Sequence, residues 1–350
     1  MADDTSSDDA APAYRALALQ ATCRAVNRAA DRAEARGIMK ASIDRLHELI
    51  AAGIRFIGPD CRLVVLPEYV LTGHPVGESI EVWADRAAIE PDGPEHQGLA
   101  AIARDLSIYL SANAYETDPN FPGLYFQCSF VIDPAGALVL RHRRLNSMFT
   151  PTPYDVWDRF LELYGIEGVF PVARTEIGRL ACIASDEILF PELARALALR
   201  GAEVFCHSTS EAGTLERSKA IARRARALEN LAYVVSANTA GIEGSPIPGG
   251  STDGGSQIVD HGGRVLVEAG YGESMAAYAE LDVAAVRRAR RRPGMANLLA
   301  RNRLAAYAST YAEAPSQEPN GIPEGRVPGR TFFLDQQRAL IERLERDGLI

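Results

Sequence analysis

Ser185 is the residue of this sequence whose position best suits a nucleophile. The stretch 177–184 is apolar and typical of a buried strand, residues 185–187 are polar, and Pro191 with Glu192 is typical of a first helical turn. The chain therefore turns sharply between a strand and a helix at Ser185, which is where α/β folds often place catalytic groups. A serine hydroxyl there can attack a carbonyl carbon if a neighbouring group accepts its proton.

Two charged residues stand at the ends of other strand-like runs. Residues 62–67 are apolar up to Pro67, so Glu68 emerges just beyond the end of a short buried strand. Residues 124–133 and 137–143 predict a hairpin, and Arg144 follows its second strand. A carboxylate can transfer protons, and a guanidinium supplies a permanent charge that can hold an oxyanion or a substrate carboxylate.

The elements that must position these groups alternate between strand and helix, which predicts a layered α/β fold. With 350 residues, 47% of them hydrophobic, we expect one domain over 13–312, after an acidic disordered tail over 1–12. Residues 313–350 predict a C-terminal arm with a helix, which packs either on a partner subunit or on its own. The expected strands are 14–23, 62–68, 107–114, 124–133, 137–143, 180–184, 202–206, 233–237, 257–260, 264–268 and 275–281, and the expected helices are 31–52 with Gly53 as a stop, 98–106, 192–200, 215–230, 295–307 and 331–345.

Several of these segments resemble the nitrilase superfamily of carbon–nitrogen hydrolases. They are residues 63–73 (LVVLPEYVLTG), 133–144 (DPAGALVLRHRR) and 178–205, and residues 224–233 are similar to a helix that precedes the next strand in that family. The resemblance covers about residues 17–291. It implies a four-layer α-β-β-α sandwich that pairs with a second subunit, as a homodimer or a larger homo-oligomer.

The resemblance also implies roles for the residues described above. Glu68 matches the general base of the family, whereas Arg144 stands where the family has a catalytic lysine and Ser185 where it has a nucleophilic cysteine. A second acid is found in many members shortly after the lysine, but here no glutamate follows Arg144 until Glu162, so Asp155 is the candidate for that role. The same resemblance places four residues at the substrate: Tyr69, Asp186, Phe190 and His207.

The substitutions at Ser185 and Arg144 leave alternatives open. A hydroxyl is a weaker acid than a thiol, and serine nucleophiles normally have a histidine or lysine partner, for which His74 and His207 are candidates. Ser185 either attacks or only donates a hydrogen bond. Arg144 either preserves the positive charge, holds a substrate anion, or is a solvated charge at a strand end.

Cys182 does not replace the missing thiol in this interpretation. It lies three residues before Ser185 on the same strand, so its side chain points to the opposite face. Cys206, on another strand, remains an outside candidate. The five cysteines are an odd number within apolar runs, which indicates reduced core thiols.

Composition excludes several classes of function. The net charge of −9 disfavours a nucleic-acid partner, and the basic run 287–292 is interpreted as a helix end, with an anion or partner site as the alternative. No run of eighteen apolar residues predicts a membrane span, and residues 1–12 lack the features of a signal peptide, so we expect a cytoplasmic protein. No spacing of His, Cys, Asp and Glu predicts a metal site, and no cofactor is expected.

The sequence therefore predicts an enzyme that acts on a small carbon–nitrogen compound such as an amide or nitrile. Because the thiol is missing, the usual cysteine acyl-enzyme route is not expected, and direct activation of water by Glu68 is favoured over a covalent intermediate. The alternative is a catalytically silent homologue that binds a ligand or regulates a partner.

Overall fold

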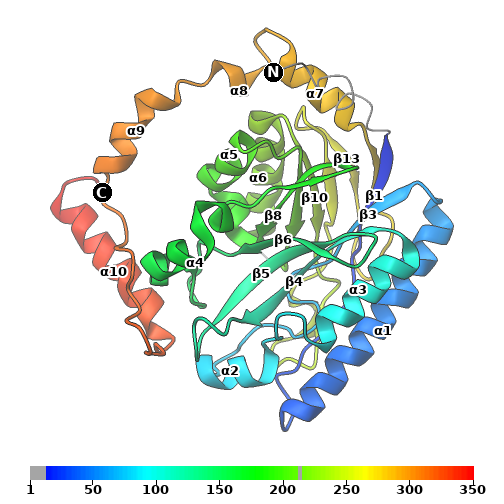
Figure 1. Ribbon diagram of the computed structural model, residues 1–350, viewed down its shortest axis with the longest axis horizontal. Helices are drawn as coiled ribbons and strands as arrows, with labels where there is room; N and C mark the ends of the chain where they lie inside the picture. The colour runs from blue at the N-terminus through cyan, green and yellow to red at the C-terminus, as the bar shows by residue number, and fades with distance from the viewer. Residues whose placement is uncertain (1–12, 212–214) are drawn as a thin grey trace.

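Two six-stranded sheets stack face to face in the computed structural model, which describes residues 13–211 and 215–350 (Figure 1). Both are mixed sheets with three neighbouring parallel strands near the middle. The first sheet has the order β14 (Tyr278–Leu281), β1 (Tyr14–Ala18), β3 (Cys61–Val65), β4 (Tyr109–Thr117), β5 (Tyr125–Ile132), β6 (Leu138–Arg143). The second has the order β13 (Val265–Glu268), β12 (Gln257–Val259), β10 (Tyr233–Ala237), β9 (Val204–Ser208), β8 (Gly178–Ala184), β7 (Ala173–Thr175). A short third pair joins β2 (Cys23–Arg24) to β11 (Ile242–Glu243).

The alternation of side chains along the central strands creates three cores, one between the two sheets and one beneath the helices of each sheet. On β3, Leu63 and Val65 face the other sheet and pack in the inter-sheet core, while Val64 packs in the core beneath the helices. Leu180 and Cys182 on β8 reach the inter-sheet core from the opposite side. Strands apolar on both faces are what a sheet covered on both sides requires.

Helices cover the outer face of each sheet. The first sheet carries α1 (Arg32–Ile57), α2 (Ile80–Ala87) and α3 (Pro94–Leu106), and the second carries α5 (Pro191–Leu199) and α6 (Leu215–Asn230). These layers confirm the predicted four-layer α-β-β-α sandwich. Helices α2 and α4 (Trp157–Val169) were not expected from the sequence.

The predicted end of the first helix at Gly53 is wrong. Helix α1 continues to Ile57, and Gly58, at φ 117°, caps it by donating its backbone N–H to the carbonyl oxygen of Ile54. Gly53 lies within the helix against β1, where an added Cβ would come 3.2 Å from Leu17 Cδ2. The glycine thus serves close packing between helix and sheet rather than termination.

The predicted hairpin that leads to Arg144 is confirmed. Strands β5 and β6 pair antiparallel, and the side chain of Asp133 accepts hydrogen bonds from the backbone N–H groups of Ala135 and Ala137. Gly136 occupies the left-handed position of the turn at φ 81°. This turn fixes the register that brings the end of β6 to the site.

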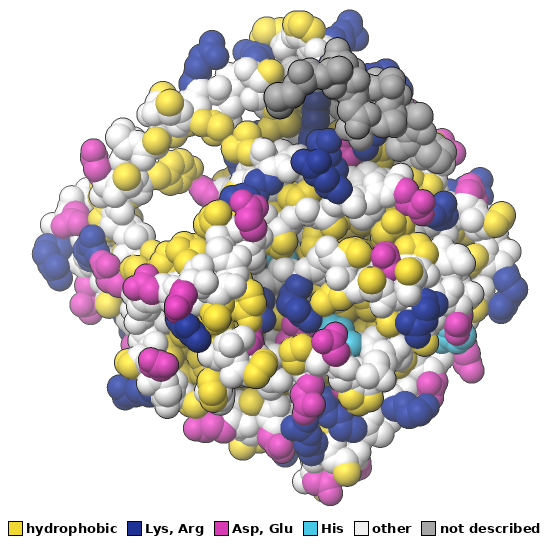
Figure 2. All heavy atoms as spheres, viewed as in Figure 1, with side chains coloured by type: hydrophobic (Ala, Val, Ile, Leu, Met, Phe, Trp, Pro, Cys, Tyr) yellow, Lys and Arg dark blue, Asp and Glu magenta, His cyan; other side chains and the backbone are white. Residues whose placement is uncertain are grey.

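After α7 (Val283–Arg291), the chain runs through α8 (Leu298–Arg301) and α9 (Leu304–Glu313) to the predicted C-terminal arm, residues 313–350, whose helix is α10 (Thr331–Arg346) (Figure 1). Every residue of α9 is exposed, and an opening separates this segment from the body in Figure 2. The sequence left open whether residues 313–350 pack on their own subunit or on a partner. Residues 317–333 pack on their own subunit, where Ile322 and Phe333 join the core beneath the first sheet.

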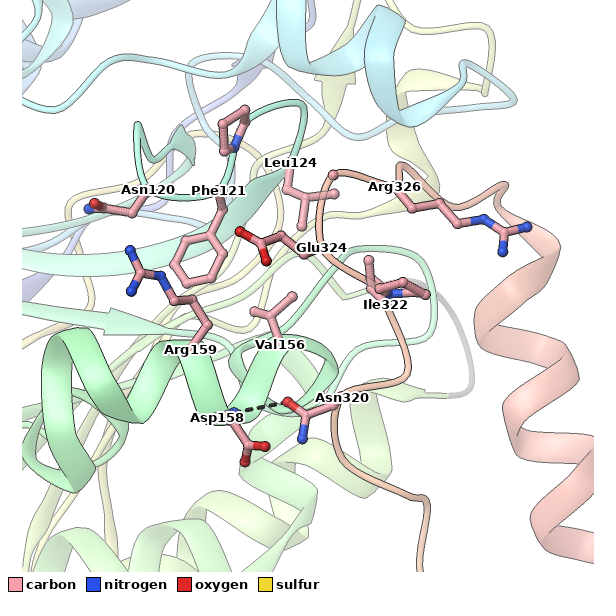
Figure 3. A pocket seen from close by; sticks show the side chains of 13 residues that line it. Asn120, Phe121, Leu124, Val156, Asp158, Arg159, Asn320, Ile322, Glu324 and Arg326 are labelled. Carbon is pink, nitrogen blue, oxygen red and sulfur yellow. Dashed lines mark hydrogen bonds between the residues drawn. The ribbon is translucent and has the colours of Figure 1, made fainter.

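Backbone hydrogen bonds tie this inner part of the arm to the start of α4. Asn320 N donates to the Tyr154 carbonyl oxygen and Ile322 N to that of Asp155, each at 3.0 Å. A cavity of about 260 Å³ lies beneath the arm, lined by Phe121, Leu124 and other residues (Figure 3). None of its lining residues belongs to the predicted site.

Other predictions have mixed outcomes. All five cysteines are free and buried, as expected of core thiols. Within the described part of the chain, no helix combines the length and apolar character needed to cross a membrane. The predicted tail over 1–12 lies outside the described residues.

Candidate active site

Glu68 lies beyond the end of β3 and is 2% exposed. Its Oε1 accepts a hydrogen bond from Gln127 Nε2 at 2.6 Å, and its Oε2 accepts one from the backbone N–H of Ser210 at 3.0 Å. Its own backbone N–H donates to the carbonyl oxygen of Thr209. The carboxylate is therefore held between β5 of one sheet and the segment after β9 of the other.

Arg144 follows β6 and lies beside this carboxylate. Its NH1 is 3.7 Å from Glu68 Oε1 and donates to Gln127 Oε1 at 2.7 Å, while its Nε donates to the Asn146 carbonyl oxygen at 2.7 Å. Its NH2 forms an ion pair with Asp186. With its side chain 12% exposed and engaged on several sides, Arg144 is not a solvated strand-end charge.

Ser185 is the first residue after β8 and begins the 3-10 helix η2 (Ser185–Leu189). Its φ of 52° lies in the left-handed region, which is unfavourable for a residue with a Cβ and persists only where the surroundings enforce it. The residue is 7% exposed. Its carbonyl oxygen accepts a hydrogen bond from His207 Nε2 at 2.8 Å.

The side chain of Lys219, on α6, contacts the side chain of Ser185. Its Nζ is 3.5 Å from Ser185 Oγ and donates to Thr209 Oγ1 at 3.0 Å. Burial lowers the pKa of the Lys219 ammonium to about 8; the nearby Arg144 also lowers it and Glu68 opposes the shift. The residue is 2% exposed.

The structure thus brings Glu68, Arg144 and Ser185 to one place. Glu68 contacts Arg144 directly, Arg144 binds the residue that follows Ser185, and Lys219 connects the Ser185 hydroxyl to Thr209. Their roles in catalysis remain predictions.

The residues predicted to bind substrate take different positions. Tyr69 is buried beside Glu68, with its ring 5.4 Å from that of His74. Asp186 is partly exposed and paired with Arg144, and Phe190 is 41% exposed at the end of η2.

His207 is fully buried, and both of its ring nitrogens are bonded. A carbonyl oxygen only accepts, so Nε2 donates to Ser185, and Nδ1 therefore accepts from the Ser236 hydroxyl at 2.8 Å. Burial, followed by the charge of Arg223, holds the pKa of His207 well below its usual value of 6.5. The imidazole is neutral and directed at the Ser185 backbone, not at its hydroxyl.

Glu187 and Asp155 make structural contacts. Glu187 is fully buried and pairs with His142 at 2.9 Å, while its Oε1 accepts from the backbone N–H groups of Leu145 and Asn146. It therefore ties η2 to the segment that carries Arg144. Asp155, the candidate second acid, accepts from the backbone and hydroxyl of Thr152 and caps the 3-10 helix η1 (Pro153–Val156).

Cys182 and Cys206 lie opposite each other in the pairing of β8 with β9 and pack in the inter-sheet core. Both are 0% exposed. Burial raises the pKa of the Cys182 thiol well above its usual value of 9.0, so this thiol is not poised to ionise.

Sequence reasoning missed Lys219 and Gln127. Lys219 lies 34 positions after Ser185, in no local motif. One signal was present, because Lys219 is one of only two lysines in the chain. Gln127, which bonds both Glu68 and Arg144, could have been found from its position on β5, next to the strand that Arg144 follows.

Among residues 13–211 and 215–350, no group of three or more His, Cys, Asp or Glu side chains is arranged to hold a metal ion.

A family model for carbon-nitrogen hydrolase matches residues 22–291. The chain belongs to the carbon–nitrogen hydrolase family. This membership confirms the resemblance to the nitrilase superfamily on which the site prediction was based.

Curated relatives and solved structures agree with this assignment. The chain is 27% identical over 187 residues to a formamidase of Bacillus thuringiensis (strain Al Hakam), a match that covers 53% of this chain and 52% of the relative. The match thus spans about half the length of this curated relative.

Two solved structures share the fold. A carbon-nitrogen hydrolase from Helicobacter pylori G27 superposes with a TM-score of 0.66 at 20% identity, covering 86% of this chain and 99% of that one. A mutant of the amidase from Nesterenkonia sp. AN1 superposes with a TM-score of 0.60 at 20% identity, covering 85% and 97%; it shows the acetamide moiety of fluoroacetamide covalently added to its active-site cysteine.

Proposed function

We propose that this carbon–nitrogen hydrolase family member hydrolyses the carbon–nitrogen bond of a small amide at Glu68, Arg144 and Ser185. The observation that carries the proposal is the buried Glu68 carboxylate, oriented by Gln127 and Ser210 and 3.7 Å from the Arg144 guanidinium. Such a fixed acid–base group beside a fixed cation is suited to amide hydrolysis, where a proton must move and an oxyanion develops.

The similarity to a formamidase and to an amidase supports an amide as the substrate. A small substrate is supported by the low exposure of the site, with Glu68 at 2% and Ser185 at 7%. In this site Glu68 transfers protons, and the positive charge of Arg144 stabilises negative charge on the substrate oxygen. The Cys-dependent route of the amidase is not available, because Ser185 supplies a hydroxyl instead of a thiol.

The test is ammonia release from a panel of small amides, nitriles and carbamoyl compounds. We expect turnover by the wild-type protein on at least one short amide and a loss of about 10²–10⁴-fold in the Glu68→Gln variant. Glu81→Gln, on the exposed face of α2, is the matched control and should retain full activity.

The alternative of a silent homologue predicts another result. The wild-type protein would then release no ammonia from any compound, and turnover would appear only in Ser185→Cys, where the thiol is restored. That outcome would overturn the proposed function.

A further inference from the structure

The environment of Lys219 is unusual for a lysine. The only other lysine of the chain, Lys40, has a side chain that is 75% exposed and pairs with Asp44. Lys219 is 2% exposed, and the two hydrogen-bond partners that the structure gives its Nζ are the hydroxyl oxygens of Ser185 and Thr209. A buried ammonium without a directly bonded carboxylate is expensive, so this site lowers the pKa of the Lys219 ammonium toward the neutral range.

Charged groups lie on several sides of Lys219. Glu68, after β3, raises its pKa, whereas Arg144, after β6, and burial lower it, with burial the largest of these influences. His207 on β9 is neutral. One turn further along α6, Arg223 is already paired with Glu211. The result is a pKa of about 8, so a minor share of the amine is unprotonated at neutral pH and this share rises as the pH passes 8.

The other bases near Ser185 do not serve its hydroxyl. His207 donates from Nε2 to the Ser185 carbonyl oxygen, and its Nδ1 is occupied by Ser236. Glu68 is engaged by Gln127 and Ser210, and a carboxylate is a weak base for an alcohol. Lys219 Nζ, at 3.5 Å from Ser185 Oγ, is the base whose position fits.

We infer that Lys219 is the general base that activates Ser185 as a covalent nucleophile, making this site a serine–lysine amide hydrolase. The inference rests on the proposed function and deepens it. It replaces the direct activation of water that the sequence favoured because the thiol is missing, since Lys219 supplies the base that a serine hydroxyl needs.

An amide substrate reacts first with Ser185. As Ser185 Oγ bonds to the carbonyl carbon, its proton passes to the lone pair of Lys219 Nζ and the carbonyl electrons move onto oxygen. Collapse of this adduct breaks the carbon–nitrogen bond, and the leaving nitrogen takes the proton from the Lys219 ammonium. The product is an ester on Ser185, with ammonia or an amine released.

Water then hydrolyses the ester. Glu68 accepts one proton from the attacking water while the hydroxide part bonds to the carbonyl carbon. The carbon–oxygen bond to Ser185 breaks, the proton passes from Glu68 by way of Lys219 Nζ to Ser185 Oγ, and a carboxylic acid leaves. One amide and one water thus give one carboxylic acid and one amine.

The test uses phenylmethylsulfonyl fluoride, which sulfonylates an activated serine and releases fluoride without needing an amide substrate. We expect labelling of Ser185, located by peptide mass mapping, with a rate that rises through a midpoint near pH 8. Lys219→Met and Lys219→Arg should each lose labelling by at least about 10²-fold, since neither side chain can accept the proton. Lys40→Met is the matched control and should label like the wild type.

A further variant keeps the test informative if the Lys219 variants fail to fold. Glu68 stabilises the Lys219 ammonium, so Glu68→Gln should shift the labelling midpoint to lower pH while Ser185 remains reactive. An unchanged midpoint in Glu68→Gln, equal labelling in a folded Lys219→Met, or no labelling of wild-type Ser185 would each overturn the inference.

The outcomes also separate the inference from the proposed function. Lys219-dependent labelling without amide turnover supports the serine–lysine pair but overturns amide hydrolysis as the function. Amide turnover that is lost in Glu68→Gln but survives Lys219→Met supports the proposed function and overturns the serine–lysine pair.

Discussion

His207 Nε2 donates a 2.8 Å hydrogen bond to the carbonyl oxygen of Ser185, and this contact helps to hold Ser185 in its left-handed backbone conformation. The imidazole can serve in this way because Ser236 on the neighbouring strand β10 bonds its other nitrogen. His207 is therefore a positioning residue for the nucleophile rather than its base. The backbone conformation of Ser185 therefore depends on the protonation state of the buried His207.

Protonation of His207 should destabilise the fold. Because burial holds its folded-state pKa well below 6.5, the unfolded chain takes up a proton near pH 6.5 while the folded chain does not. The stability associated with His207 is thus complete above pH 6.5 and is lost as the pH falls below it. One such proton changes the free energy of unfolding by about 1.4 kcal/mol per pH unit.

Urea unfolding of the wild type and His207→Gln between about pH 8 and pH 5 measures this effect. We expect a shallower loss of stability with acid in His207→Gln, because glutamine does not titrate. His47→Gln, at a partly exposed histidine on α1, should follow the wild-type curve. Identical slopes in His207→Gln and the wild type would show that His207 does not remain neutral in the fold.

Arg144 should contribute both charge and shape. Arg144→Met removes the cation beside Glu68 and Asp186, so we expect kcat to fall by about 10²–10³-fold, the usual cost of losing an oxyanion donor. Arg144→Lys keeps the charge but loses the planar fork, so its kcat should lie between that of the wild type and that of Arg144→Met. Steady-state kinetics on the best amide measures both variants.

The same kinetics distinguishes the two interpretations of Arg144. If Arg144 holds a substrate anion, KM for carboxylate-bearing amides should rise far more than kcat falls. Arg159→Met, at an exposed arginine, is the control and should leave both constants unchanged.

The fold could be predicted largely from periodicity and turn residues. Strand β10 and helix α6 were predicted with their observed bounds, because each is a continuous run whose period is unambiguous. The error at Gly53 arose because glycine signals both helix ends and close helix–sheet packing, and only the position of Leu17 distinguishes the two. Helix α2 is short, with only eight residues, so its pattern was weak.

The site could be predicted only in part. Glu68, Arg144 and Ser185 each follow a strand, so their approach could be inferred from the strand ends. Lys219 projects from the helix that covers the second sheet, and nothing in its local sequence distinguishes it from a surface lysine. Its burial against Ser185 is a property of helix–sheet packing, which the sequence pattern does not specify.

The inner part of the arm should stabilise its own subunit. Ile322 is 4% exposed and packs in the core beneath the first sheet, so Ile322→Ala should lower the free energy of unfolding by about 2–5 kcal/mol. Ile341 on α10 is 42% exposed, and Ile341→Ala should change it little. Urea unfolding at several protein concentrations checks both variants. Equal stability of the two would contradict the packing of residues 317–333 on their own subunit.

The arginines of the basic run 287–292 lie in very different environments. Arg287 is 8% exposed and forms a two-pronged ion pair with the buried Glu203, at 2.7 Å and 3.0 Å. Arg290 donates to carbonyl oxygens of residues 202, 230 and 231. The contacts of these two arginines are internal and fasten α7 to the second sheet.

Arg287→Met should therefore be costly, since it leaves the Glu203 carboxylate buried without its cation. We expect a loss of about 3–5 kcal/mol in the free energy of unfolding. Arg288→Met is the matched control, because Arg288 pairs with Asp282 at the surface and such pairs contribute at most about 1 kcal/mol. Replacing both partners, as Glu203→Leu with Arg287→Met, should recover part of the loss, because it removes the uncompensated charge. A double variant as unstable as Arg287→Met alone would show that lost packing, and not the buried charge, causes the effect.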